Sequence, residues 1–455
     1  MRSGQTKYGI GMTVSACLWL GLFPLLQFGT FHTLTRDKWI IMFILGGVSL
    51  VCFIVDCFCR RVTRPRLLPL LLGGALLLWM LLSCLLSPYP GAPWWIGTGR
   101  REGLATRLCY FGLFFLFSFS RVRRTPVIIS SVCGVFAFLA VVLLQRAGGN
   151  PFGLYPGSYS FATAPGFQGT IGNVDMCAGY LLIVAGLFVP ALTDALAAFF
   201  RSFRKKTADD SAAASRGKRI RWLAALSVLF LAAALAACVY LFITMEVRFG
   251  LLTMAVLVGW SLVRLLPKKF RIPVLLLLIA AVLLVVWFYP FTQVSTLNEL
   301  HETLHGRVKL TYGTGRIGVW YYTFKMLREE GRLWLGTGVD TYATRFSTWL
   351  QQYLGAHPEA EKLRYYFDNP HNEYLALVVD CGIPAMLLYA ALIICGCFGA
   401  RAWRDSVLCY GIQALLSFSV CIVAPMLWVV LGMSFSMPPP KKPKPAEPAL
   451  QKPEA

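Results

Sequence analysis

Charged side chains are scarce in this chain, and acidic ones are the scarcest. Of its 455 residues only 14% are Asp, Glu, Lys or Arg, and no more than 21 residues are acidic. Soluble globular proteins carry about 25% charged residues, so this composition excludes a soluble enzyme, a coiled coil and a disordered chain. Large polar segments are scarce too, and this excludes a single-span receptor with an external domain.

Apolar residues make up 57% of the sequence, the mean hydropathy is +0.63, and apolar runs of membrane-spanning length recur along it. A bilayer core needs about 20 such residues per helix. The first run lacks a small-residue cleavage site after it, so we expect a helix there and not a signal peptide. The last run is long and contains Pro425, which predicts two short helices joined by a tight turn and about 12 transmembrane helices in all. The runs lie at 8–28, 38–58, 67–87, 104–120, 126–146, 172–199, 222–243, 249–266, 272–290, 373–399 and 407–436.

The net charge of +22 does not indicate nucleic-acid binding, because the basic residues lie in short turns between the apolar runs. With a cytoplasmic N-terminus, the inside segments hold 27 of the 43 basic residues, and most of the others lie in the long outside loop 291–371, where the charge bias is a weak signal. The positive-inside rule therefore predicts that both termini are cytoplasmic. Most of the 14 Cys lie in or beside apolar runs and none lies in 291–371, so no disulfide framework is indicated.

The sequence thus predicts an all-α polytopic membrane protein in four parts. Residues 1–290 form helices one to nine, 291–371 form a large extracytoplasmic loop, 372–436 form helices ten to twelve, and 437–455 form a Pro- and Lys-rich cytoplasmic tail. The loop is too long to be a mere connector. It contains an amphipathic helical pattern with its apolar face at Ile317, Trp320, Tyr321, Phe324 and Leu327.

Four arginines on the predicted outer side lie at unusual positions. Arg100 and Arg101 precede the fourth helix in GTGRREG, Arg248 lies in a short break between two helices, and Arg316 opens the amphipathic loop helix. An arginine near a membrane is costly without a partner, and its planar fork suits phosphate oxygens. As a set they fit a diphosphate clamp. Singly, each also fits a headgroup anchor or a salt bridge, such as Arg248 with Glu246.

Histidines give two further candidates. His371 lies in FDNPHNEYL, where the long loop re-enters the membrane; it fits either proton transfer near neutral pH or an interfacial helix-capping role. His301, Glu302 and His305 form an HExxH pattern, which on a helix is typical of zinc peptidases. Glu329 or Glu330 could supply a third ligand, but the loop is small for a protease, so we favour chance spacing in a solvated helix over a peptidase or an incidental metal site.

Several segments, in order, resemble the O-antigen ligase/polymerase superfamily of bacterial membrane glycosyltransferases. They are GTGRREGL, GTIGNVDMCAGYL, the Arg-x-Gly at Arg248, GRIGVW with LWLGTGVDTY, PHNEYLALVVDCGIPA, and the closing YGIQALLSFSVCIVAPMLWVVLG. His371, Asn372 and Gly382 follow the ligases' H-N-x9-G spacing, with Ala385 where a second Gly is expected. Val247 stands where a Ser is common, and Val174 with Asp175 replaces the usual Pro-Asn pair, which leaves the acceptor open.

This resemblance implies a GT-C-like, metal-independent glycosyltransferase without cofactor, in the cytoplasmic membrane of a bacterium. Its donor would be a glycan on a polyprenyl diphosphate, its acceptor a glycan, lipid or protein, and its other partners membrane lipids. Arg248 and Arg316 would hold the diphosphate, and His371 would assist acceptor attack. His371 should therefore lie beside Arg316, because the long loop starts and ends at the outer membrane surface and can fold back over the site. The substrate-binding candidates are Arg100, Arg101, Asn372 and Trp320.

Ligase and polymerase both remain open, because they share the donor grip and differ in the acceptor. A glycolipid transporter or flippase is the alternative of another class, but transporters place charges near the bilayer midplane. Here the basic residues lie at the outer helix ends, which favours chemistry at the surface. The aspartates within or near apolar runs, Asp175, Asp194 and Asp380, are expected to have structural roles.

The predicted orientation is testable by cysteine labelling in a background without the 14 native cysteines. A Cys at Ala356 should react with an impermeant reagent in intact cells, and a Cys at Ala213 should react only after lysis, because basic inside turns fix the topology. The opposite labelling pattern would overturn the orientation.

Overall fold

The computed structural model describes residues 8–89, 93–204, 211–289, 295–358 and 367–436. These residues are predominantly helical, with one two-stranded antiparallel sheet of β1 (Phe167–Gln168) and β2 (Gly172–Asn173). The all-α prediction is confirmed. The predicted cytoplasmic tail, 437–455, lies outside the described residues.

Every predicted apolar run coincides with helix. Within the described ranges, seven helices are long and apolar enough to cross a membrane, and four helical segments are apolar but shorter; the number of crossings stays a prediction. The first run is α1 (Ile10–Cys17) extended by a π turn, η1 (Leu18–Leu22), and a 3-10 turn, η2 (Phe23–Leu25). The others are α2 (Leu34–Phe58), α3 (Leu67–Leu85), α4 (Leu104–Ser118), α5 (Arg124–Arg146), α6 (Val174–Arg204), α7 (Ser211–Thr244), α8 (Arg248–Val263), α9 (Lys268–Phe288), α13 (Glu373–Cys397), α14 (Arg404–Gln413) and α15 (Ala424–Phe435).

The last apolar run is two helices, as predicted, but a tight turn does not join them. Residues 414–423 form a ten-residue link of turns and bends between α14 and α15. Pro425 lies in the first turn of α15, where its missing N–H has no intrahelical acceptor to lose. The link buries Phe418 and places Ser419 beside Arg107 of α4, from which it accepts a hydrogen bond (3.2 Å).

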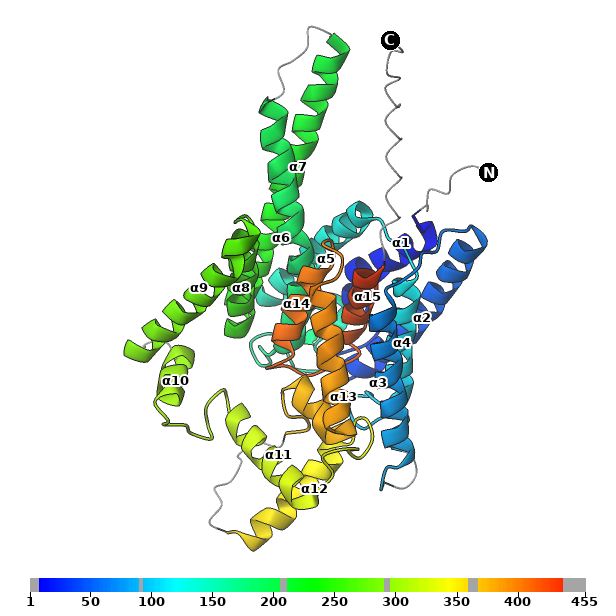
Figure 1. Ribbon diagram of the computed structural model, residues 1–455. Coiled ribbons are helices and arrows are strands. Elements are labelled where there is room, and N and C mark those ends of the chain that lie inside the picture. Colours follow the sequence, from blue (N-terminus) through cyan, green and yellow to red (C-terminus); the bar gives the residue numbers. More distant parts are fainter. Residues whose placement is uncertain (1–7, 90–92, 205–210, 290–294, 359–366, 437–455) are drawn as a thin grey trace, which may run out of the picture.

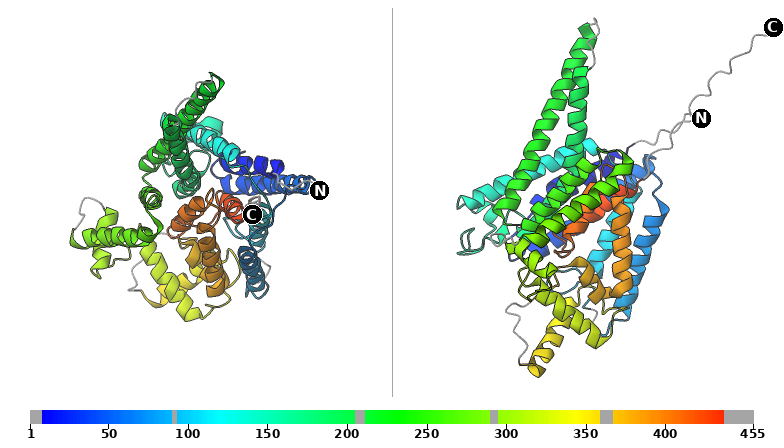
Figure 2. Two further views of the ribbon diagram at one scale, coloured as in Figure 1. Left: turned by 45° about the horizontal axis from the view of Figure 1, so that its top comes forward. Right: turned by 60° about the vertical axis from the view of Figure 1, so that its left-hand side comes forward.

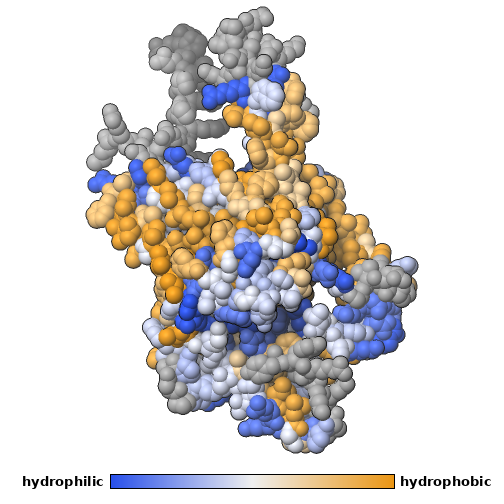
Figure 3. Space-filling model, turned by 180° about the vertical axis from the view of Figure 1, so that it is seen from behind, coloured by the Kyte–Doolittle hydropathy of each residue, from blue (hydrophilic) through white to orange (hydrophobic). Residues whose placement is uncertain are grey.

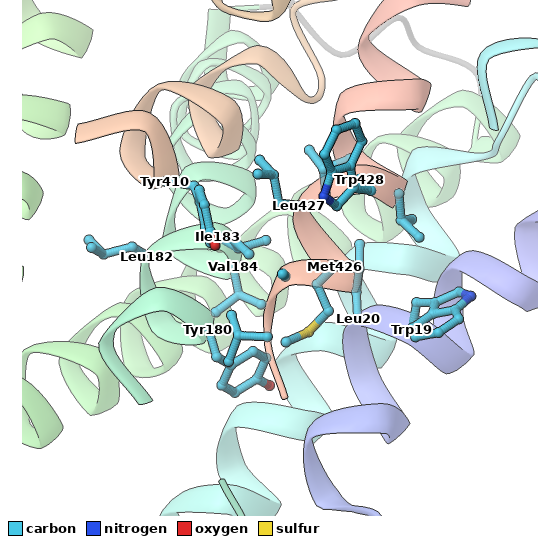
Figure 4. Packing of buried hydrophobic residues seen from close by; sticks show 14 of the residues in the cluster. Trp19, Leu20, Tyr180, Leu182, Ile183, Val184, Tyr410, Met426, Leu427 and Trp428 are labelled. Atoms are coloured by element: carbon cyan, nitrogen blue, oxygen red, sulfur yellow. The ribbon is translucent and has the colours of Figure 1, made fainter. Parts of the chain in front are cut away.

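One hydrophobic core holds the bundle together. Figure 4 shows side chains of η1, α6, α14 and α15 meeting there, among them Trp19, Tyr180 and Trp428. The Trp428 ring lies 4.7 Å from that of Phe111 on α4. Gly186 on α6 leaves no room for a Cβ against the backbone of Ser406 on α14, the close approach that small residues allow between membrane helices.

The large loop contains three helices, α10 (Ser295–Leu304), α11 (Arg316–Glu330) and α12 (Tyr342–Ala356). A short 3-10 turn, η3 (Pro151–Gly153), lies between α5 and α6, outside this loop. The predicted helix at 317–327 is present as α11, but its predicted apolar face is only partly right. Leu327 is buried and Trp320 packs beside it, but Tyr321 and Phe324 are exposed, and Tyr322 and Met326 pack with α12 against α13 instead. The buried face is rotated because the partner of α11 is α12 and α13, which no local pattern reveals.

We call the end of the bundle where α11 and α12 pack the loop end (lower in Figure 1). At the other end Gly9 donates to the carbonyl of Arg121, Thr63 donates to that of Phe119, and Ser436 bridges to Pro65. The described chain therefore begins and ends at the same end. The α6–α7 hairpin extends beyond that end (Figure 2). Figure 3 shows, on the face that it presents, an apolar band across the bundle and a more polar surface toward the loop end.

Helix α13 is broken in its middle. Gly382 has φ +82° and ψ 172°, and Pro384 follows it. The polar groups freed by the break are taken up by residues 333–338 and by α3. Asp380 O accepts from Thr337 N (2.9 Å) and Gly338 N (2.8 Å), Ile383 N donates to Leu333 O (2.8 Å), and Trp79 Nε1 donates to Cys381 O (2.8 Å).

Asp380 extends this contact with its side chain. Its carboxylate accepts hydrogen bonds from the backbone N–H groups of Asp340 (3.0 Å) and Tyr342 (3.1 Å), at the start of α12. Asp340 in turn accepts from Thr98 N at 2.7 Å, which fixes the turn that carries Arg100. The structural role expected for Asp380 is thus to connect the large loop with the turn before α4.

The break in α13 makes Gly382 a sensitive position. A Cβ there would collide with the carbonyl of Trp334, and φ is positive; Gly382→Ala should destabilise the protein by roughly 2–5 kcal/mol. The matched control is Gly355→Ala on α12, where a Cβ meets open space and Ala favours the helix. Thermal unfolding in detergent measures both; equal melting temperatures for the two variants would contradict the docking.

Candidate active site at the loop end

Four segments far apart in the sequence converge at the loop end. They contribute Arg100 before α4, Asp175 in the first turn of α6, Arg316 at the start of α11, and Asp368 and His371 before α13; the link after α14 adds Phe418. We call these six residues the loop-end cluster. The predicted proximity of Arg316 and His371 is present here, because both side chains meet the carboxylate of Asp175.

Arg316 is presented by a turn rich in glycine. Gly315 caps α11 with φ +87°, a left-handed conformation that glycine adopts without strain. The guanidinium then reaches α6: Nη2 lies 3.2 Å from Asp175 Oδ2, and Nη1 lies 3.1 Å from Thr314 Oγ1. Its Nε is buried without a hydrogen-bond partner. The hydrogen-bonding capacity of the guanidinium is therefore not filled by the protein's own acceptors.

His371 is held by its neighbours along the chain. Its N–H donates to Asn369 Oδ1 (2.9 Å), Trp320 Nε1 donates to Pro370 O (2.7 Å), and Asn372 caps α13 by accepting from Leu375 N (2.9 Å). The imidazole packs edge-on against Phe418, with ring centres 5.0 Å apart. These bonds give Asn372 and Trp320 positioning roles, and they place His371 directly before the helix, as predicted.

The imidazole of His371 faces a carboxylate without bonding to it. Nδ1 lies 4.0 Å from Asp175 Oδ2 and has no hydrogen-bond partner. Burial, then the charges of Arg316 and Arg100, lower the pKa of His371 to about 4, and Asp368 opposes this shift. The ring is therefore neutral near pH 7 and able to accept a proton.

Arg100 is held from two sides. It forms a bidentate pair with Asp368, at 2.6 Å from Nε and 2.8 Å from Nη2, and its Cζ lies 3.9 Å from the centre of the Phe418 ring. Burial favours the neutral acid of Asp368, but the hydrogen bonds from Arg100 prevail and hold its pKa below the ordinary value. Two arginines and two aspartates thus balance one another in the cluster.

Two predicted arginines lie elsewhere. Arg101 points to α2, where its Cζ is 5.3 Å from the centre of the Trp39 ring. Arg248 is exposed at the start of α8, with Nη1 3.4 Å from Thr296 Oγ1 on α10. Glu299 on the same helix accepts from Gly313 N (2.9 Å) in the turn before Arg316. Helix α10 thus links Arg248 to that turn.

The HExxH pattern does not gather a ligand set. Glu302 forms a bidentate pair with Arg307 (2.6 and 2.9 Å), and His301 Nδ1 lies 2.7 Å from Val286 O. Glu329 accepts from Trp349, and Glu330 from Arg345. Over the described ranges, no three His, Cys, Asp or Glu side chains are grouped to hold a metal ion.

A cavity of about 50 Å³ continues inward from the Arg100–Asp368 pair, with room for a few water molecules. Glu102 and Arg107 form an ion pair at 3.1 Å on its wall, and Tyr110 donates to Glu102. No sequence pattern indicated this polar pair, Asp368 or Phe418. For Asp175 the sequence predicted only a structural role, although its motif, GNVDM, lies at the start of a helix, α6.

The family comparison matches a segment of the chain that holds half of the loop-end cluster. A family model described as O-antigen ligase matches residues 231–390, from within α7 to within α13, and this segment includes Arg248, Arg316 and His371. None of the curated proteins matches the chain. The match confirms the resemblance of the chain to the O-antigen ligase/polymerase superfamily, and the apolar helices indicate a multi-pass membrane protein.

Proposed function

We propose that the loop-end cluster transfers a glycan from a polyprenyl diphosphate to an acceptor hydroxyl, at the outer face of the cytoplasmic membrane of a bacterium. The observation that carries this proposal is the meeting of Arg316 and His371 at one carboxylate, Asp175. It places a phosphate-binding fork beside a neutral base, within the segment that matches the O-antigen ligase family.

The guanidinium groups of Arg316 and Arg100 bind the donor diphosphate. Their planar forks match phosphate oxygens in bidentate fashion. As the bond between the sugar C1 and the phosphate oxygen breaks, negative charge grows on that oxygen, and fixed positive charge stabilises it most at the transition state. Arg248, which contacts Thr296 on α10, holds the diphosphate from the side of α8.

His371 serves the acceptor. Its neutral imidazole accepts the proton of the attacking hydroxyl while the new bond from that oxygen to C1 forms and the diphosphate leaves with the electron pair. The polyprenyl tail lies along apolar surface near the cluster. Helix α9 offers such surface, because only 6% of its most apolar segment is buried inside the protein.

The direct test uses purified protein in lipid nanodiscs with a polyprenyl-diphosphate-linked glycan and two acceptors, a glycolipid and a second carrier-linked glycan. Glycan moved to the glycolipid identifies a ligase, and a longer glycan on the carrier identifies a polymerase. Absence of any transfer to these and to protein acceptors would overturn the proposed function.

Arg316→Lys should lower the transfer rate by about 10²–10³-fold, because lysine keeps the charge but loses the fork. The matched control is Arg307→Lys, an exposed arginine whose carboxylate partner, Glu302, lies on α10. It should transfer at the wild-type rate. The measurement is initial rate in the nanodisc assay; an Arg316→Lys protein as fast as this control would contradict the clamp.

His371→Ala should slow transfer by about 10²–10⁴-fold, the usual contribution of a positioned acid–base group. Since the pKa of His371 is about 4 in the free protein, kcat/KM should fall only as the pH approaches 4, where the imidazole becomes protonated. His371→Gln separates orientation from proton transfer: full recovery of the rate would reject the role as base.

Three controls accompany this measurement. His357→Ala, directly after α12, should retain full activity, because the His357 side chain stacks on the Tyr353 ring and contacts the Tyr353 carbonyl, outside the loop-end cluster. The double variant His301→Ala, His305→Ala and the wild type in excess chelator should also remain active. Loss of wild-type activity on chelation would reject the metal-independent mechanism.

A further inference from the structure

The carboxylate of Asp175 lies between the side chains of Arg316 and His371, and it forms a hydrogen bond with Arg316 only. Its Oδ2 is 3.2 Å from Arg316 Nη2 and 4.0 Å from His371 Nδ1. The first distance is a charge-assisted hydrogen bond, and the second is too long for one. The side chains of Asp175, Arg316 and His371 are 22%, 20% and 21% exposed, so solvent and ligand can reach all three.

The position of Asp175 is fixed from the backbone, not from its carboxylate. Its N–H donates to Asn173 Oδ1 at 2.8 Å, at the junction of β2 and α6. The carboxylate can therefore turn about its side-chain bonds without moving the helix. A shift of about 1 Å brings it within hydrogen-bond distance of Nδ1.

Four charged groups lie around His371, and the link after α14 packs the uncharged ring of Phe418 on it. The charged groups are Asp175 on α6, Arg316 on α11, Arg100 before α4 and Asp368 in the same loop as the histidine. A diphosphate bound to the arginines brings negative charge to Arg316 and competes with Asp175 for its fork. Because the two anions repel each other, the carboxylate gains by leaving Arg316 for another donor.

We propose that Asp175 is a positioning residue that changes partner when the donor binds. Without donor it pairs with Arg316; with the diphosphate on Arg316 it turns to accept a hydrogen bond from the Nδ1–H of His371. This bond fixes the tautomer, so Nε2 carries no proton and faces the acceptor hydroxyl. The inference rests on the proposed function for its substrate, a diphosphate.

The exchange couples donor binding to the strength of the base. In the free protein the two arginines and burial keep His371 a weak base, with its pKa near 4. Bound diphosphate neutralises the arginines, and Asp175 then stabilises the protonated ring, so the pKa of His371 rises. During transfer the hydroxyl proton moves to Nε2, the oxygen bonds to C1, and the electron pair of the broken C1–oxygen bond stays on the diphosphate.

The test uses inorganic pyrophosphate as probe and the variant Asp175→Asn, which keeps the shape and removes the charge. Without the competing carboxylate, Arg316 is free, so pyrophosphate should bind roughly tenfold more tightly. Transfer should nevertheless be at least about tenfold slower, because the amide does not hold the histidine as a carboxylate does. A merely structural role would weaken both binding and transfer.

A second readout follows the histidine itself. In wild-type protein, the NMR titration of His371, assigned with His371→Gln, should move up by about one pH unit or more when pyrophosphate is added. In Asp175→Asn this shift should be smaller. The matched control is Asp194→Asn at the other end of α6, which pairs with Arg124 and Arg401 and should behave as wild type in both measurements.

The outcomes separate this inference from the proposed function. Unchanged or weaker pyrophosphate binding by Asp175→Asn, or a His371 titration that does not respond to pyrophosphate, would overturn the exchange even if glycan transfer is observed. Tighter binding with the expected titration, in a protein that transfers no glycan to any acceptor, would support the exchange and reject the proposed function.

Discussion

The arrangement of the loop end depends on the break in α13. A helix interrupted at membrane depth exposes backbone N–H and C=O groups, and lipid offers them no partner. Here residues 333–338 of the large loop and Trp79 of α3 supply the missing hydrogen bonds at Asp380, Cys381 and Ile383. The break is therefore stable only with the loop docked on it. This makes the loop part of the bundle and not an appended domain.

The consequences of this docking reach the charged groups in steps. The Asp380 carboxylate accepts a hydrogen bond from the backbone N–H of Tyr342 at the start of α12. Asp340, two residues before Tyr342, accepts one from the N–H of Thr98 and so fixes the turn there. That turn carries Arg100, whose guanidinium pairs with Asp368 next to His371. Hydrogen bonds from backbone N–H groups to the carboxylates of Asp380 and Asp340 thus position an arginine that lies about 270 residues from its partner in sequence. The frame of the cluster is therefore fixed by the backbone of the loop and of the turn before α4.

The sequence predicted the helices well, because membrane insertion demands long apolar runs and leaves little else to decide. It predicted Arg316 and His371 as neighbours from the family resemblance. It did not predict the face of α11, the link between α14 and α15, or the parts of Asp368 and Phe418, because these depend on tertiary partners. Asp175 was undervalued for the same reason: one carboxylate at a helix start has no periodic signal, and its meaning comes from the arginine and histidine that the fold brings to it.

The charge balance of the cluster has a physical cause. An arginine at the membrane surface is costly unless water or a counter-ion attends it, and Arg316 and Arg100 each have an aspartate. Of these groups, Arg316, Asp368 and His371 lie within residues 231–390, the segment that matches the O-antigen ligase family. Asp175 and Arg100 lie outside it. The matched segment therefore supplies one arginine, one aspartate and the histidine. The preceding part of the chain supplies the second arginine and the second aspartate, so the matched segment alone does not complete the cluster.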